Sequence, residues 1–296
     1  MRFLSSIPRA ALASLMLIAL AGFATDVTLY QQSVEKWRQD YEAKLKSDSG
    51  WLSVAGLFWL HEGENFFGSD PDNDIVLPYP SMPGRAGKFQ FHQGATVAYI
   101  TSDLPVTMKG KPVSVATLHP DSPDERLVTG DLLMYVHASG GRFSIRLKDK
   151  NSKLRREFHG TTWFPVNEAY RVTARYTRLE AVRPVEIETV LGDHEKLQIA
   201  GYCTFKLNGE EIRLDAEQDE TGALFIVFRD LTSAKDTYPA ARFLDTLPPK
   251  DGTVELDFNK AYNPPCAYNP YTTCPLPAPG NRLRLEIPAG EKRYHQ

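Results

Sequence analysis

The chain has 296 residues, of which 42% are hydrophobic and 24% are charged, and its formal net charge at pH 7 is −3. These proportions are typical of a globular protein with one large domain or two domains of common size. The mildly acidic balance argues against nucleic acid or anionic lipid as the main partner.

Residues 1–24 have the pattern of a secretory signal peptide. Arg2 and Arg9 form a basic start, residues 10–23 are almost entirely apolar, and Ala24 is a small residue suited to cleavage. The apolar run is too short for a confident membrane span. We therefore expect cleavage near Ala24, a periplasmic or secreted protein, and no stable membrane span after cleavage.

No lipid anchor is expected, because Phe23 occupies the position where a lipoprotein signal needs cysteine. Cleavage after Ala24 would remove two of the 34 basic residues. It would leave 32 against 37 acidic residues, a net charge of −5.

Residues 25–50 predict one amphipathic helix. Apolar side chains recur at spacings of four, three, four and four, at Tyr30, Val34, Trp37, Tyr41 and Leu45. Thr25 or Asp26 can cap the start of this helix, and the polar residues 47–50 can end it. The helix could bind a partner or pack across its own β domain, and we favour packing.

From Trp51 onward, alternating patterns and short glycine turns predict strands, and no long helical segment separates them. The predicted strands are 88–92, 96–101, 112–117, 132–137, 142–147, 170–176, 185–190, 198–207, 211–214, 223–228, 253–258 and 282–287. Glycine turns are expected at 92–94, 109–111 and 207–210. The fold class is therefore mainly β, with two antiparallel β-sandwich or barrel domains and one N-terminal helix. Residues 51–160 would form the first domain and residues 161–296 the second.

The first domain has a particular order of features. A glycine-containing loop at Gly68 precedes the strand-like segment 73–77, which is followed by paired strands and a late Gly130-Asp131. This order resembles a forkhead-associated β-sandwich over residues 57–138. The resemblance implies that fold for the first domain.

The phosphate-binding residues of forkhead-associated domains are not matched. Those domains bind phosphothreonine through an Arg just after the glycine, but Ser69 follows Gly68 here. Ser81 could supply a loop hydroxyl, while Ala86 stands near the place of a structural His. Without the Arg, phosphate recognition loses its charge-assisted hydrogen bonds, so we expect the fold without this activity.

Most of residues 30–292 also resembles an uncharacterised bacterial family, domain of unknown function 1684. The resemblance is carried by short segments at residues 56–60, 67–71, 145–149, 163–165, 237–238, 242–244, 256–259, 261–266 and 273–276. The Asn-Pro-Pro-Cys motif at residues 263–266 and the Thr-Cys-Pro-Leu-Pro motif at residues 273–277 are specific. The resemblance implies no activity and no catalytic residues.

Residues 254–283 are rich in proline and hold two of the three cysteines. In an exported protein we expect a disulfide between Cys266 and Cys274, which flank a turn-prone segment. Free buried thiols and a metal site are the alternatives. Zinc is disfavoured because no CxxC or HxxxH pair supplies further ligands, so no metal is expected. Cys203 alternates as a strand residue would, and we expect it to be buried.

Polar residues that follow the strand 253–258 are candidates for a ligand site, because proline-stiffened loops are preorganised. Asp257, Asn259, Tyr262 and Asn263 would lie at one rim, with Arg242 or Arg282 within reach of Asp257. An equally open alternative is a structural plug in which Asp257 satisfies backbone N–H groups.

Two further candidates lie outside this loop. Arg146 belongs to the cation-rich segment 141–165, which is either a solvated basic face or an anion site. Tyr238 ends the polar loop 230–238, which could line a pocket or only form turns.

No nucleophile motif such as G-x-S-x-G occurs, and the seven His lack metal spacing. We therefore expect a small polar or anionic ligand bound in the second domain, without a cofactor. One alternative is a hydrolase that uses Asp257 as acid or base. Another is a structural or partner-binding envelope protein, whose partner the sequence does not identify.

Overall fold

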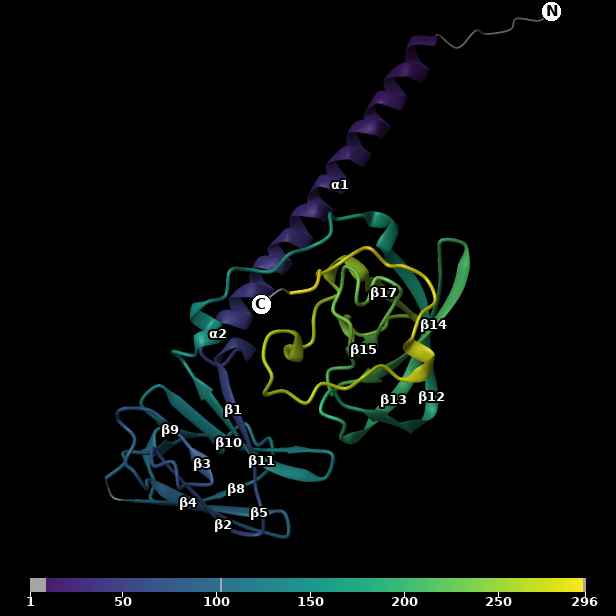
Figure 1. Cartoon of the computed structure of the whole chain (residues 1–296). Helices are drawn as coiled ribbons and strands as arrows, with labels where there is room; N and C mark the ends of the chain where they lie inside the picture. Colours follow the sequence, from purple (N-terminus) through teal and green to yellow (C-terminus); the bar gives the residue numbers. More distant parts are fainter. Residues whose placement is uncertain (1–8, 102, 295–296) are drawn as a thin grey trace, which may run out of the picture.

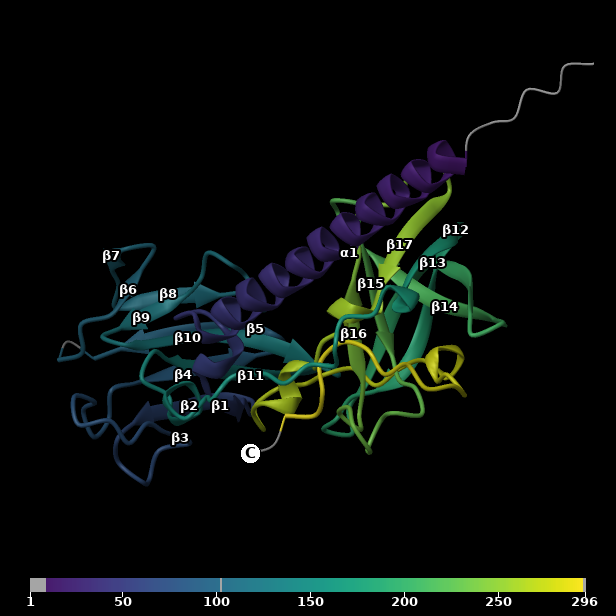
Figure 2. The same cartoon turned by 90° about the horizontal axis from the view of Figure 1, so that it is seen from above.

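The computed structural model describes residues 9–101 and 103–294, with side chains from Thr28 onward. The protein is mainly β, with antiparallel sheets and one long N-terminal helix, as predicted (Figures 1 and 2). The sheets fall into two groups along the chain, at residues 54–149 and 171–257. We call these groups, with the loops attached to each, the first and the second domain.

The first domain is a sandwich of two sheets. One has the strand order β1-β11-β10-β9-β6-β7 and the other β3-β2-β4-β5-β8. Its strands are β1 (Val54–Trp59), β2 (Gly63–Gly68), β3 (Ile75–Val76), β4 (Gly87–His92), β5 (Ala95–Ile100), β6 (Thr107–Met108), β7 (Lys111–Pro112), β8 (Val115–Leu118), β9 (Leu127–Thr129), β10 (Leu132–Ser139) and β11 (Arg142–Asp149).

One buried core joins the two sheets of the first domain. Phe67 and Phe89 from one sheet pack in the same cluster as Met134, Ile145 and Leu147 from the other. All strand pairs in these sheets are antiparallel except β2 and β3, which pair in parallel over two residues. The alternation read from the sequence is therefore the signature of sheets buried on one face.

The second domain is a single curved sheet that forms a half-barrel, with the strand order β16-β15-β14-β13-β12-β17. Its core contains Phe205, Phe228, Phe258 and the predicted buried Cys203, which is 0% exposed. The strands are β12 (Arg171–Glu188), β13 (His194–Leu207), β14 (Glu210–Gln218), β15 (Leu224–Phe228), β16 (Arg242–Asp245) and β17 (Thr253–Asp257).

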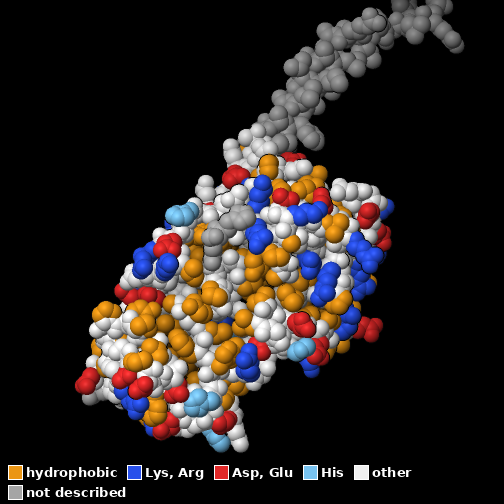
Figure 3. Space-filling model, in the orientation of Figure 1, with side chains coloured by type: hydrophobic (Ala, Val, Ile, Leu, Met, Phe, Trp, Pro, Cys, Tyr) orange, Lys and Arg blue, Asp and Glu red, His pale blue; other side chains and the backbone are white. Residues whose placement is uncertain are grey.

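Short helical turns complete the described chain. They are η1 (Trp51–Ser53) before β1, α2 (Lys153–Arg156) and η2 (Glu168–Tyr170) between the domains, and η3 (Phe258–Lys260), η4 (Pro265–Ala267) and η5 (Pro279–Asn281) after β17. The C-terminal segment runs across the open side of the second domain (Figure 1). Figure 3 shows hydrophobic side chains gathered over the middle of this face, where the domains meet.

Most predicted strands and all three predicted glycine turns are present. The turns at Gln93-Gly94, Lys109-Gly110 and Asn208-Gly209 each place both residues at positive φ, the conformation of a tight hairpin turn. The strands expected at 170–176 and 185–190 are one long strand, β12, with an irregular register between Arg178 and Arg183.

The strand expected at 282–287 is wrong. Leu283 and Leu285 pack inward while Arg284 and Glu286 are exposed, so the alternation is real. However, the segment pairs only loosely with residues 229–231, with a single isolated bridge at Arg282. Alternation alone does not show whether a neighbouring strand is available.

The helix α1 (Arg9–Lys46) packs on its own protein through the predicted apolar face. Tyr30, Val34 and Leu45 are buried, and Trp37 and Tyr41 are half-buried. The helix ends just before residues 47–50, as expected, but it begins at Arg9 instead of at a cap near Thr25. The continuous helix shows that Thr25 and Asp26 do not break the backbone hydrogen bonding. Among the described residues, no helix is long and apolar enough to cross a membrane.

Candidate functional site

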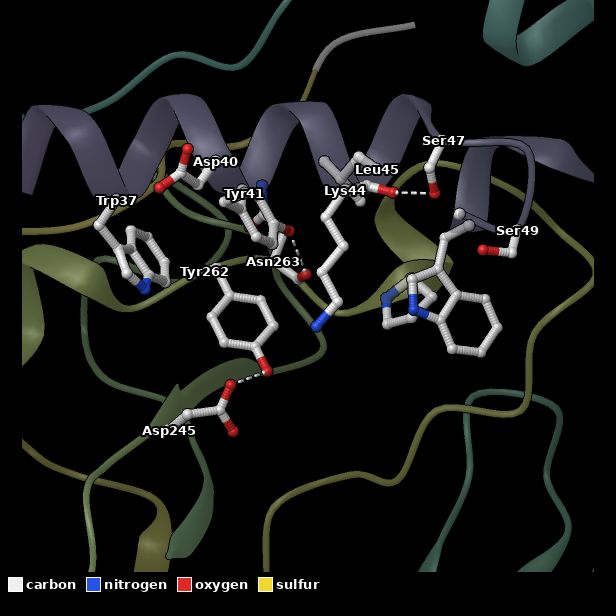
Figure 4. A pocket seen from close by; sticks show the side chains of 13 residues that line it. Trp37, Asp40, Tyr41, Lys44, Leu45, Ser47, Ser49, Asp245, Tyr262 and Asn263 are labelled. Atoms are coloured by element: carbon white, nitrogen blue, oxygen red, sulfur yellow. Dashed lines mark hydrogen bonds between the residues drawn. The ribbon is translucent and has the colours of Figure 1, made fainter. Parts of the chain in front are cut away.

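A cavity of about 350 Å³ lies between α1 and the second domain (Figure 4). It is lined from three directions, by α1, by the turn that follows α1, and by β16 with the proline-rich segment after η3. The lining residues are Trp37, Asp40, Tyr41, Lys44, Leu45, Ser47, Ser49, Gly50, Trp51, Asp245, Tyr262, Asn263 and Pro265.

Aromatic rings form one wall of this cavity. Trp37 and Tyr41, one turn apart on α1, stack with their ring centroids 5.5 Å apart. The ring centroid of Tyr262 lies 5.2 Å from that of Tyr41. Trp163 packs edge-on against Tyr41, with the ring centroids 5.8 Å apart. Each ring is held by another, so the wall is fixed before any ligand arrives.

Polar groups gather at the opposite side. The Tyr262 hydroxyl donates a hydrogen bond to Asp245 Oδ2 at 2.8 Å. Lys44 extends from α1 so that its ammonium group points toward this pair (Figure 4). Desolvation among the rings raises the pKa of Asp245, against the opposing effects of Tyr262 and Lys44. Burial, reinforced by Asp245, raises the pKa of Tyr262, which therefore stays protonated.

A buried hydrogen-bond network supports the aromatic wall. Tyr41 Oη lies 3.2 Å from Tyr268 Oη and 3.3 Å from the Asn263 carbonyl, to which it donates. Glu291 accepts from the Tyr268 hydroxyl and, at 2.8 Å, from the Asn263 N–H. Burial raises the pKa of Glu291 to about 7. Asn263, only 2% exposed, has a side-chain oxygen without a hydrogen-bond partner among the described residues.

Two of the sequence candidates, Tyr262 and Asn263, therefore line the cavity. Two others do not, because Asp257 and Asn259 fasten α1 to the second domain. Asp257 Oδ1 accepts from the Tyr30 hydroxyl at 2.8 Å and from the Asn259 N–H at 3.2 Å, and Asp257 Oδ2 lies 3.1 Å from Lys260 Nζ. The Asn259 amide donates to Tyr30 Oη at 2.9 Å.

The expected pairing of Arg242 or Arg282 with Asp257 is not found. Arg242 is 1% exposed and pairs with Asp230 at 2.6 Å, and it donates to the Ile287 carbonyl at 3.0 Å. The bond from Arg242 to the Ile287 carbonyl thus holds the C-terminal segment in place. Arg282 is exposed and donates from Nε to the Pro277 carbonyl at 3.2 Å.

The remaining candidates, Arg146 and Tyr238, both act on the cysteine loop. Tyr238 donates to the Cys266 carbonyl at 3.1 Å, and the positive charge of Arg146 acts on the Cys274 thiol. The predicted disulfide is absent from this structure, in which all three cysteines are free thiols. Cys274 Sγ instead accepts a hydrogen bond from the Cys266 N–H at 3.2 Å, so the turn brings the two residues together without a bond.

The sequence did not single out several cavity residues. Trp37 and Tyr41 were assigned only to the packing face of the helix, and Lys44, Trp51 and Asp245 were not considered as site residues. Lys44 follows Tyr41 by three positions on α1, a spacing that places both on one face. A polar residue beside an aromatic stripe was the available signal. Asp245 gave no such signal, because its partner is 17 residues away.

No group of three or more His, Cys, Asp or Glu within the described part of the chain could hold a metal ion.

Residues 156–292 match the model of a family described as a protein of unknown function, DUF1684. No curated protein matches the chain.

Solved structures provide three comparisons. An uncharacterised protein of Haloarcula marismortui is 35% identical and covers 47% of this chain and 78% of its own, with a TM-score of 0.40. A forkhead-associated domain studied for phosphothreonine-dependent interactions is 17% identical and covers 30% of this chain and 79% of its own, with a TM-score of 0.22. The forkhead-associated domain of FhaA, complexed with the intracellular domain of Rv3910, is 17% identical and covers 30% of this chain and 84% of its own, also with a TM-score of 0.22.

Proposed function

The chain belongs, through residues 156–292, to the DUF1684 family of proteins of unknown function, and we propose that it binds a small polar ligand in the cavity between α1 and the second domain. The ligand is neutral or zwitterionic and about as large as a monosaccharide. Ligand pockets in proteins are typically concave, mostly apolar and roughly 300–1,000 Å³ in volume. A cavity of about 350 Å³ lies at the small end of that range.

The aromatic wall carries this proposal. Stacked rings offer flat apolar faces, and the C–H face of a sugar ring or of a small cyclic zwitterion packs well on such a surface. Lys44 supplies hydrogen-bond donors and Asp245 supplies acceptors on the other side. A ligand with one apolar face and several hydroxyl or amine groups matches both walls.

The charges at the cavity favour a ligand without net charge. Lys44 and Asp245 bring one positive and one negative group, and Asp40 is already paired with Lys36 at 2.5 Å. An anion would meet Asp245 and a cation would meet Lys44. A neutral or zwitterionic ligand avoids both repulsions.

Thermal-shift titration of the purified protein with monosaccharides and amino acids tests the proposal. A ligand that binds only the folded state stabilises it by about 2.7 kcal/mol at one hundred times its Kd, which raises the Tm. Lys44→Met should weaken binding about tenfold, since a hydrogen bond from a charged group is lost. Lys46→Met is the matched control, because Lys46 is exposed on the same helix and does not line the cavity.

The proposal is wrong if no compound in the panel raises the Tm, or if the Lys44 and Lys46 variants bind a ligand equally well. In the first case a structural or partner-binding role becomes the better explanation. A hydrolytic role for Asp257 has less support than ligand binding, because one of its carboxylate oxygens already accepts bonds from Tyr30 and Asn259.

The proposal also includes export. The basic start and apolar run of residues 1–24 support it, and the buried contacts of α1 named above all come from Tyr30 onward, after the expected cleavage point. In an oxidising compartment Cys266 and Cys274 would become bonded. N-terminal sequencing of the exported protein should start near Thr25, and an intact Met1 would contradict export.

A further inference from the structure

Cys266 and Cys274 lie where the proline-rich segment of the second domain meets the first domain. Thr273, next to Cys274, contacts His137 of β10 at 3.1 Å between Oγ1 and Nε2. Asn269, within the same turn, donates to the Trp51 carbonyl at 2.9 Å. These contacts hold the cysteine turn against the sheet face that carries Arg146.

Arg146 is a buried cation without sufficient partners. It is 4% exposed, in the centre of β11, and its Nε and Nη2 atoms make no hydrogen bond to any described residue. The guanidinium carbon Cζ of Arg146 lies 5.8 Å from the ring centroid of Trp51. A buried guanidinium in this state needs nearby negative charge. The Asp121 carboxylate, whose pKa the charge of Arg146 helps to lower, supplies part of it, and the Cys274 sulfur is a second group that can provide it.

The surroundings of Cys274 favour its thiolate. Its sulfur accepts a hydrogen bond from the Cys266 N–H at 3.2 Å, and the thiol donates to the Thr272 hydroxyl oxygen at 3.7 Å. The hydrogen bond from the Cys266 side chain, then that N–H, Thr272 and Arg146, lower the pKa of Cys274 despite its burial. The same bond to Cys274 raises the pKa of Cys266, which therefore keeps the proton of the pair.

We infer that Cys266 and Cys274 form a thiol–disulfide exchange site, in which the Cys274 thiolate is balanced by Arg146 of the first domain. The co-reactant is a small disulfide, R–S–S–R. Cys266 is half-buried and Cys274 is buried, so the disulfide enters at Cys266. The inference shares one element with the proposed function, which is the oxidising compartment. The exchange reaction can be measured on the purified protein whether or not the protein is exported.

The exchange has two steps. The Cys266 thiol passes its proton to the Cys274 thiolate and attacks R–S–S–R, which forms Cys266–S–S–R and releases R–S⁻. R–S⁻ takes the proton from Cys274. The restored Cys274 thiolate then attacks the Cys266 sulfur, forms the Cys266–Cys274 bond and releases a second R–S⁻, which takes a proton from water. The pair is oxidised by two electrons, and the small disulfide is reduced to two thiols.

The positive charge of Arg146 stabilises the reduced pair, because only that form carries the thiolate. Loss of this charge should therefore shift the equilibrium toward the disulfide. Equilibration of the native protein with glutathione buffers of fixed thiol-to-disulfide ratio, followed by acid quenching and mass-spectrometric counting of alkylated thiols, measures this shift. Arg146→Met should raise the value of [GSH]²/[GSSG] at which half of the pairs are open about tenfold, equivalent to about one pKa unit of the thiol. At a fixed concentration of glutathione disulfide this is about threefold more reduced glutathione.

Arg85→Met is the matched control. Arg85 lies in the same domain, but it is exposed and its guanidinium carbon lies 4.2 Å from the ring centroid of Phe66. Its replacement should leave the glutathione equilibrium unchanged. The inference is overturned if the native pair exchanges with glutathione only after denaturation, or if the Arg146 and Arg85 variants shift the equilibrium equally.

A second measurement does not require a change at Arg146. In Cys266→Ser, the serine hydroxyl can still donate to Cys274, and ultraviolet thiolate absorbance against pH reports Cys274 ionisation. Burial raises the pKa of Cys203 to about 12, so Cys203 does not contribute at neutral pH. A Cys274 midpoint below that of an ordinary cysteine supports the inference, and a midpoint at or above it overturns the thiolate assignment.

Discussion

Glu291 is a carboxyl group enclosed by the protein, 1% exposed, behind the aromatic wall of the cavity. Its oxygens accept hydrogen bonds from the Asn263 N–H and the Tyr268 hydroxyl. These bonds favour the charged form, but desolvation outweighs them and raises the pKa to about 7. The protonation state of one buried side chain is therefore coupled to the folding of this wall near neutral pH.

We predict that Glu291 makes the protein less stable as the pH rises from 4.5, its ordinary pKa, to about 7. In this window the folded state keeps a proton that the unfolded state has lost, so the free energy of unfolding falls with pH and levels off above it. The contribution is on the order of 3 kcal/mol. Urea unfolding at several pH values, compared between wild type and Glu291→Gln, measures it.

The glutamine side chain introduced by Glu291→Gln has the shape of the protonated acid and does not titrate, so the variant should lack this part of the slope. Glu286→Gln is the control, because Glu286 is exposed and pairs with Lys235 at 3.0 Å. Parallel stability curves for wild type and the Glu291 variant would contradict the prediction.

The sequence predicted the kind of environment for single residues better than their partners. Cys203 was expected to be buried, and it is 0% exposed. Asp257 was expected to lie within reach of Arg242 or Arg282, but it is bonded to Tyr30 in a buried contact and is 5% exposed. Its partner Tyr30 is 227 positions away, so no local pattern could identify it. Arg242 shows the same limit, since Asp230 and the C-terminal carbonyls meet it only after the chain has closed on itself.

At the scale of elements, periodicity was a reliable guide wherever one face of an element is buried. The apolar spacing of α1 and the alternation of β10 and β11 follow directly from this one-sided burial. The helix start was not predictable from Thr25 or Asp26, since a capping residue is only a preference that continuous helix hydrogen bonding can override. The cavity was also missed, because it lies between α1 and a loop more than 200 positions later.

We predict that Tyr30→Phe loosens α1 from the second domain. The Tyr30 hydroxyl donates to Asp257 and accepts from Asn259, so its loss removes two buried hydrogen bonds and leaves Asp257 short of a donor. The cost should be about 1–2 kcal/mol. Hydrogen exchange should speed up at the amides of residues 30–46 more than in the sheets. Tyr99→Phe, at an exposed position of β5, should change neither quantity, and equal effects of the two variants would contradict the prediction.

At the scale of the whole molecule, polar contacts join the tip of the β10–β11 hairpin to the start of β13. Arg142 pairs with Asp193 at 2.6 Å, and Ser139 donates to Glu195 at 2.6 Å. Both acidic residues belong to the second domain. The sequence could not predict this junction, because exposed charges pair with many possible partners at little difference in energy. The division into two domains at residues 51–160 and 161–296 stays a prediction.

Two neighbouring glycines at the hairpin tip allow a test of this junction. Gly140 and Gly141 have φ of 56° and 75°, so an alanine at either position strains the backbone of the hairpin. They differ in their surroundings. A Cβ atom at position 140 would lie 2.6 Å from Cβ of Asp193, whereas one at position 141 would meet nothing within 4 Å.

We predict that Gly140→Ala weakens the contact between the domains and that Gly141→Ala does not. Both variants should lose a similar amount of stability, about 1 kcal/mol, through strain at a left-handed position. Only Gly140→Ala should also displace Asp193, which would break its ion pair with Arg142 and open the junction. Small-angle scattering should then show a larger radius of gyration, and protease cleavage between the domains, in residues 150–170, should become faster. If the two variants match in scattering and in cleavage, the hairpin contact does not set how the domains are held together, and the cysteine turn and α1 must hold them instead.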